Sequence, residues 1–119
     1  MKSTQSSEDY LEAILVLSQK LSEVHAVDVA GHLGLTKASV SVAMKKLREN
    51  ECVYYSENGA LLLTKTGREI ADRVYEKHIF FKANLMKLGI EEDKAEEEAC
   101  QIEHVISEES FQALKKYIK

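Results

Sequence analysis

The stretch HAVDVAGHLGLTKASVSVAMKKLREN, residues 25–50, decides the fold that we expect of this chain of 119 residues. A short helix is expected to stop at Gly34, because glycine tolerates the positive φ of a tight turn. A second helix begins after Thr36, a residue type that caps helix N-termini. The small contact residue, the turn residue and the apolar residue of a helix-turn-helix are then Ala30, Gly34 and Val40.

The segments on either side extend this motif to a winged helix-turn-helix. A first helix is expected over 7–21, and its apolar residues cover almost its whole circumference, which is typical of a buried helix. The stretch ECVYYSENGALLLTKTG, residues 51–67, predicts two strands around Asn58-Gly59, a dipeptide that favours hairpin turns. Three helices followed by a hairpin wing predict a DNA-binding domain over 1–70.

The remainder of the chain, residues 71–119, is expected to form a helical domain. A long helix capped by Thr66 should end at Gly89, and the helices predicted here cover 66–88, 92–106 and 108–118. The fold class is therefore mainly α, a winged helix-turn-helix with a small β-hairpin wing followed by a helical dimerisation domain. A homodimer is expected because the long helix has more apolar surface than one helix pair would expose, at Phe80, Phe81, Leu85 and Leu88.

The second helix of the motif is basic although the chain has a formal net charge of −4. A locally basic helix can neutralise DNA phosphates, while serines in its first turns can reach base edges and a valine can contact a thymine methyl. A basic helix can also be a solvated face, and some winged helices bind proteins instead. The candidate DNA-binding residues are Thr36, Lys37, Ser39, Ser41, Val42, Lys45, Lys46 and Arg48.

A second pattern, in residues 96–107, has ligand chemistry. Cys100, Glu103 and His104 follow the spacing i, i+3, i+4, which brings their side chains to one flank of a helix. Thiolate, carboxylate and imidazole together are ligand types of a divalent transition metal. The alternative is an inert, half-buried cysteine beside a surface Glu-His pair.

Three other residues add to the metal hypothesis. His78 occupies the middle of an apolar stripe, where a histidine is more often a core residue bonded to a carbonyl. Asp9 and Glu12 lie at i, i+3 on the mostly apolar first helix, and buried carboxylates are costly unless they are paired or bound to metal. A helix-dipole effect is the alternative, and it explains Asp9 better than Glu12.

Five stretches in order carry a resemblance to a known family. They are SSEDYLEAILVL (6–17), KASVSVAMKKL (37–47), LLLTKTGREIA (61–71), KHIFF (77–81) and EACQIEHVIS (98–107). Together they resemble the diphtheria toxin repressor family of metal-dependent transcriptional repressors, across nearly the whole chain. The resemblance implies a winged helix-turn-helix followed by a helical dimerisation domain, with metal bound between the two domains turning on operator binding.

The resemblance also implies a ligand set, carried over position by position: Asp9, Glu12, His78, Cys100, Glu103 and His104. The carboxylates of the first helix match the manganese-responsive branch, whereas Cys100 matches the iron-responsive branch. Lys82 and Glu96 stand where the iron branch has a carboxylate and a histidine of a second metal site. By this resemblance, no third, SH3-like domain of the iron branch is expected within these 119 residues, and the sequence stops earlier than the pattern of the manganese branch.

The implied function is a repressor that binds Fe²⁺ or Mn²⁺, with Fe²⁺ slightly favoured, and that docks as a homodimer on a palindromic DNA operator. A thiolate favours softer ions, so Co²⁺ and Zn²⁺ can also bind in vitro. Metal uptake genes are the implied targets, and no enzyme activity is expected. Three alternatives remain. The first is a redox-sensing winged-helix regulator switched by Cys52 or Cys100, and the second is a metal-independent dimeric regulator. The third is a small helical metallohydrolase, for which the sequence supplies no substrate pocket with a separate acid or base.

Composition indicates where the protein works. No apolar run approaches the ~18 residues that a membrane span needs, and the start MKSTQSSEDY lacks the apolar core of a secretory signal. The two cysteines are far apart and form no C-x-x-C pair, so two free thiols in a reducing compartment are expected. A cytoplasmic protein without membrane contact is therefore predicted.

Overall fold

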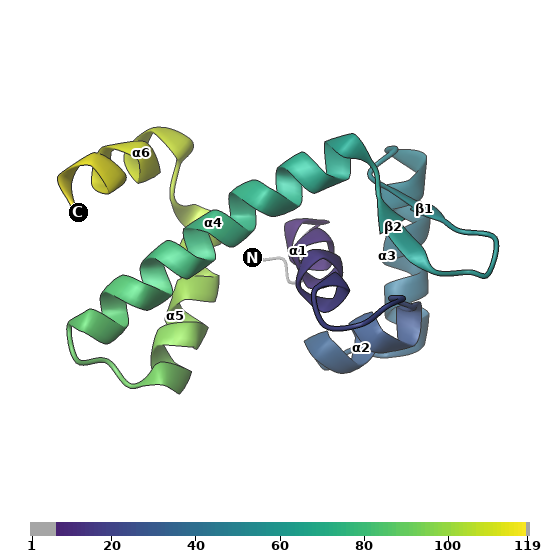
Figure 1. Ribbon diagram of the computed structural model, residues 1–119, viewed down its shortest axis with the longest axis horizontal. Coiled ribbons are helices and arrows are strands. Elements are labelled where there is room, and N and C mark those ends of the chain that lie inside the picture. The colour runs from purple at the N-terminus through teal and green to yellow at the C-terminus, as the bar shows by residue number, and fades with distance from the viewer. Residues whose placement is uncertain (1–6, 119) are drawn as a thin grey trace. The chain divides into compact units, whose positions relative to one another are not determined.

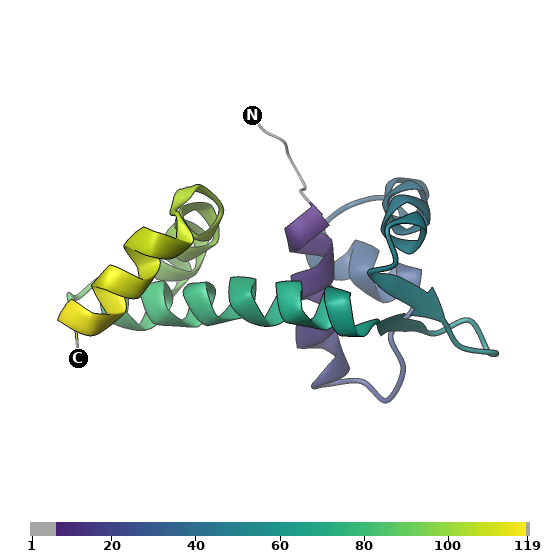
Figure 2. The same cartoon turned by 90° about the horizontal axis from the view of Figure 1, so that it is seen from above.

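The computed structural model describes residues 7–118. The chain divides into two compact units, Met1–Asp72 and Arg73–Lys119. Each unit is built mainly from helices, and the elements are labelled along the chain in Figure 1 and seen from above in Figure 2.

The first unit is a winged helix-turn-helix. Its elements are α1 (Ser7–Ser18), α2 (Ala26–Leu33), α3 (Lys37–Glu49), β1 (Val53–Tyr55) and β2 (Leu61–Leu63). Helix α1 contacts α2, α3 and β2, so it lies at the centre of the unit. The hairpin loop projects from the rest of the unit in both views (Figures 1 and 2). The expected fold class is confirmed.

The turn of the helix-turn-helix forms as its residue types predict. Gly34 has φ 70°, in the left-handed region, and its N–H bonds to the Ala30 carbonyl. The Thr36 side chain accepts a hydrogen bond from the Ser39 N–H at 3.1 Å and so caps α3. Val40 is completely buried. These residues fix the start of α3 by local hydrogen bonds.

The hairpin is antiparallel, and its loop is longer than a two-residue turn. Val53 pairs with Leu63 and Tyr55 with Leu61, which leaves five residues, 56–60, in the loop. Gly59 supplies a positive φ of 84° within it. The N–H of Leu61 also bonds to the carbonyl of Val24 at 2.7 Å, which ties the hairpin to the segment before α2.

Helix α4 (Lys65–Lys87) is capped by Thr64, so the expectation that Thr66 caps it is wrong. Thr64 Oγ1 accepts a hydrogen bond from the Gly67 N–H at 3.1 Å and donates one to the Glu51 carbonyl at 2.6 Å. The helix begins directly after β2, so the extended residue between strand and helix is the one in position to cap it. Thr66 is exposed inside the first turn.

The cap gives a test with a matched control. Thr64→Ala should lower the free energy of unfolding by about 1 kcal/mol, because an amide of the first helical turn loses its acceptor. Thr66→Ala should change it by less than about 0.5 kcal/mol, as expected of an exposed residue. Urea unfolding of both variants measures the difference. Equal effects of the two substitutions would contradict the assignment of the cap.

The second unit contains most of α4 together with α5 (Glu92–Val105) and α6 (Glu108–Tyr117). Gly89, at φ 97°, follows α4, as expected. Ala95 and Ala99 of α5 are fully buried, and α5 is linked to α4 by the contact of Glu103 with His78.

Helix α6 is held by one aromatic residue. Phe111 is fully buried, and its ring centroid lies 5.4 Å from that of Phe80 and 6.0 Å from that of Phe81. Phe80 and Phe81, predicted to form a dimer surface, are thus half-buried against Phe111 of the same chain. Leu88, from the same predicted surface, is 80% exposed.

Candidate metal centre and nucleic-acid interface

Helix α5 carries the cluster of ligand-type side chains that its spacing predicts. Cys100, Glu103 and His104 each offer a ligand atom, and these atoms lie within 4.8 Å of one another. Cys100 is half-buried, Glu103 is buried, and the His104 side chain is 25% exposed. The predicted convergence of these three side chains on one flank is therefore confirmed.

Glu103 is the most buried member of the cluster, with none of its side chain exposed. Its Oε1 lies 2.8 Å from His78 Nδ1. Its Oε2 is buried and accepts no hydrogen bond from the described residues, and it lies 3.5 Å from His104 Nε2. A buried carboxylate oxygen without a donor costs free energy. A cation would satisfy it, so these residues fit a divalent metal.

His78 lies between two carboxylates. It is buried on α4, with Nδ1 facing Glu103 and with Nε2 2.9 Å from Glu96 Oε2. Carboxylates therefore face both ring nitrogens. A histidine that binds a metal through one nitrogen usually donates from the other to a carboxylate or carbonyl, so this geometry suits a ligand.

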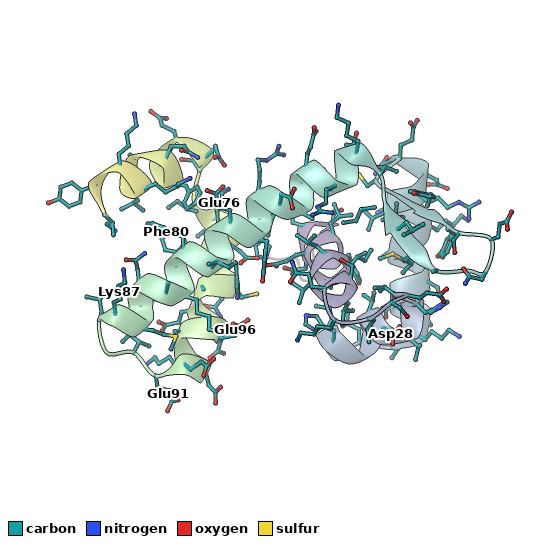
Figure 3. The ribbon with its side chains drawn as sticks, in the orientation of Figure 1. Asp28, Glu76, Phe80, Lys87, Glu91 and Glu96 are labelled. Carbon is teal, nitrogen blue, oxygen red and sulfur yellow. The ribbon has the colours of Figure 1, made fainter. Side chains whose placement is uncertain are left out.

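Glu96 was not among the predicted site residues, although it contacts one of them. It lies at i−4 from Cys100 and i−7 from Glu103 on α5, and this spacing was the available signal. Burial alone would raise the pKa of Glu96, but hydrogen bonds from Lys82 and His78, with their charges, hold that pKa below its usual value. Figure 3 shows Glu96 on α5.

The two remaining predicted ligands belong to the first unit. Asp9 and Glu12 lie three residues apart on α1, where Asp9 is 9% exposed and Glu12 is half-buried. Their part in a ligand set remains a prediction.

The predicted DNA-binding residues all lie on the exposed surface of α3 or at its cap. The buried side of the helix carries Val40, Met44 and Leu47. Val42, which is 70% exposed, lies on the opposite side together with Lys45 and Lys46. The exposed set is Thr36, Lys37, Ser39, Ser41, Val42, Lys45, Lys46 and Arg48.

Two of these residues also have contacts within the unit. The Thr36 hydroxyl donates to Ser39 Oγ at 2.9 Å in addition to capping the helix. The Arg48 guanidinium lies 5.5 Å from the ring centroid of Tyr55, a cation–π contact that links α3 to the wing. Tyr55 was missed in the sequence, because nothing local connects it to α3.

A winged helix-turn-helix with an exposed basic helix, in one chain with a helical unit that clusters thiol, carboxylate and imidazole groups, defines a metal-responsive DNA-binding regulator. The family profile described as "Iron dependent repressor, N-terminal DNA binding domain" matches residues 2–61. The profile "Iron dependent repressor, metal binding and dimerisation domain" matches residues 64–119. The chain belongs to the iron-dependent repressor family.

Individual relatives agree with this family. The chain is 34% identical over 118 residues to an HTH-type transcriptional regulator of Methanocaldococcus jannaschii, covering 98% of this chain and 94% of the relative. It is 31% identical over 104 residues to the HTH-type transcriptional regulator MntR of Bacillus subtilis, covering 87% and 73%. The solved structure of the manganese regulator SloR matches 98% of the chain with TM-score 0.85 and 31% identity. The chain spans 54% of that structure.

The family settles the class of function. Its members are metal-dependent transcriptional repressors, which bind DNA and form dimers and are not enzymes. The relatives give no support to the redox-sensing alternative. Among residues 7–118, no helix combines the length and the apolar character needed to cross a membrane.

Proposed function

We propose that this chain is a repressor in which binding of Fe²⁺ or Mn²⁺ turns on the docking of a homodimer on a palindromic operator of metal uptake genes. The observation that carries the proposal is the buried Oε2 of Glu103, which has no hydrogen-bond donor among the described residues and lies within a Cys-Glu-His cluster. Residues 1–70 would contact DNA in the cytoplasm, and residues 71–119 would bind metal and dimerise.

The proposed ligand set draws on both parts of the chain. Cys100, Glu103 and His104 of α5 and His78 of α4 would hold the ion, and Asp9 and Glu12 of α1 would complete the set. The two positive charges of a bound divalent ion would neutralise these carboxylates. Without that charge the carboxylates repel one another, and the DNA-binding domain pays a larger ordering cost when it docks on an operator.

The proposed DNA contact uses the outer side of α3. Lys45 and Lys46 would neutralise phosphates, and Val42 lies between them and the cap, where it can meet a thymine methyl. Ser39 and Ser41 are exposed in the first turns, where a recognition helix enters the major groove. Two copies related by a twofold axis would read two half-sites, which gives the palindrome.

An anaerobic titration tests the metal part. Mn²⁺, Fe²⁺, Co²⁺ and Zn²⁺ are added to the native protein, to Cys100→Ala and to His104→Ala, and the melting temperature is recorded. The native protein should be stabilised, and His104→Ala should lose that stabilisation because one ligand is gone. The ion whose effect falls most in Cys100→Ala is the ion that the thiolate selects.

The DNA part is tested with the ion that stabilises most. Selection from a random duplex pool should yield palindromic duplexes with the ion present and none in its absence. If none of the four ions stabilises the native protein, the metal-dependent mechanism is refuted.

A further inference from the structure

Lys82 of α4 lies between two carboxylates at the start of α5. Its Nζ is 3.1 Å from Glu96 Oε1 and 3.4 Å from Glu92 Oε2. The side chain is 29% exposed, so the ammonium is partly withdrawn from water. This lysine is therefore held in place by two ion pairs.

The ion pair continues inward to the metal-type cluster. Glu96 uses its other oxygen, Oε2, to contact His78 Nε2 at 2.9 Å, and His78 Nδ1 contacts Glu103 Oε1 at 2.8 Å. Lys82, Glu96, His78 and Glu103 thus form a row of four groups in which cationic or donor groups alternate with carboxylates.

Glu96, Glu103 and His78 supply two carboxylates and an imidazole, which are ligand types of divalent ions. Here the ammonium of Lys82 provides their positive counter-charge, and it would repel a divalent ion at the same place. We propose that Lys82 is a built-in cation that takes the place of a second metal ion beside the Cys100–Glu103–His104 cluster, so that each protomer binds one divalent ion. This inference rests on the proposed function, which supplies the first ion.

Lys82 also acts as a positioning residue. By holding Glu96, it keeps a carboxylate against Nε2 of His78, so that Nδ1 is the nitrogen turned toward Glu103. Such a carboxylate on the outer nitrogen fixes the orientation of a histidine at a metal site. One side chain therefore sets both the orientation of His78 and the number of ions.

Counting bound Mn²⁺ tests the inference. Metal-free protein is dialysed against Mn²⁺, and the free ion is measured from its electron paramagnetic resonance signal. The native protein and Lys82→Arg, which keeps the charge, should bind one ion per protomer. Lys82→Glu should bind two, because it removes the ammonium and adds a carboxylate next to Glu92 and Glu96.

A control and a second variant keep the test decisive. Lys87→Glu makes the same charge change at an exposed position of α4 and should bind one ion. If Lys82→Glu does not fold, Lys82→Gln should still take up a second ion, with lower affinity. The inference would be overturned if the native protein bound two ions, or if folded Lys82→Glu or Lys82→Gln bound only one. Either result would leave the proposed function standing. No ion on the native protein would instead refute the proposed function.

Discussion

Glutamine in place of Glu103 should remove nearly all of the stabilisation that Mn²⁺ gives this protein. At a concentration 100 times its Kd, an ion that binds only the native state raises the free energy of unfolding by about 2.7 kcal/mol. If Glu103→Gln weakens binding a hundredfold, the same concentration adds only about 0.4 kcal/mol. Binding is expected to weaken because glutamine replaces the negatively charged carboxylate, whose buried Oε2 has no hydrogen-bond donor among the described residues, with a neutral amide.

Urea unfolding with and without Mn²⁺ measures this loss. Glu97→Gln is the control, because it makes the same charge change at an exposed position of α5 and should keep the full stabilisation. Unchanged stabilisation in Glu103→Gln would show that the cluster on α5 is not where the ion binds.

Alanine at Gly67 should lower the free energy of unfolding by about 3 kcal/mol, at the upper end of what overpacking costs. Gly67 is buried in the first turn of α4, and a Cβ there would overlap the carbonyl group of Cys52. The obstacle is backbone and cannot rotate away. That carbonyl also accepts a hydrogen bond from the Thr64 N–H at 3.0 Å, so moving it would weaken the junction of wing and helix.

Gly31→Ala is the matched control, and its expected effect has the opposite sign. Gly31 lies on the exposed side of α2, and no atom lies near the position of an added Cβ. Alanine should therefore stabilise the protein by about 0.5–1 kcal/mol, through lower chain entropy in the unfolded state. If Gly67→Ala and the native protein had the same midpoint of unfolding in urea, the close approach of Gly67 to the Cys52 carbonyl would be absent in solution.

Local signals were enough to predict most of the fold. Gly34 and Thr36 act through hydrogen bonds within four residues, so the sequence alone defines the turn and the start of α3. The cap of α4 was misassigned because it depends on where β2 ends, which is decided by pairing across the hairpin, Val53 with Leu63. The loop length is likewise decided by strand pairing, and Asn58-Gly59 alone does not indicate it.

The same distinction holds at the candidate metal centre. Cys100, Glu103 and His104 converge because they share one helix, so their spacing was sufficient. The contact of His78 with Glu103 joins residues 25 positions apart, and no pattern within either helix indicates it. Glu96 has helical spacing to Cys100 and Glu103, but its contact with His78 crosses from α5 to α4 and depends on how the two helices pair.

The shortness of the hairpin has a consequence for how copies of this chain meet. Each strand has three residues, and one edge of β2 is already engaged where Leu61 bonds to Val24. An open strand edge recruits other chains through rows of unpaired amides and carbonyls, and short edge strands limit that process. Edge-to-edge pairing and aggregation through the wing are therefore disfavoured, which leaves the association of two copies to helical surfaces.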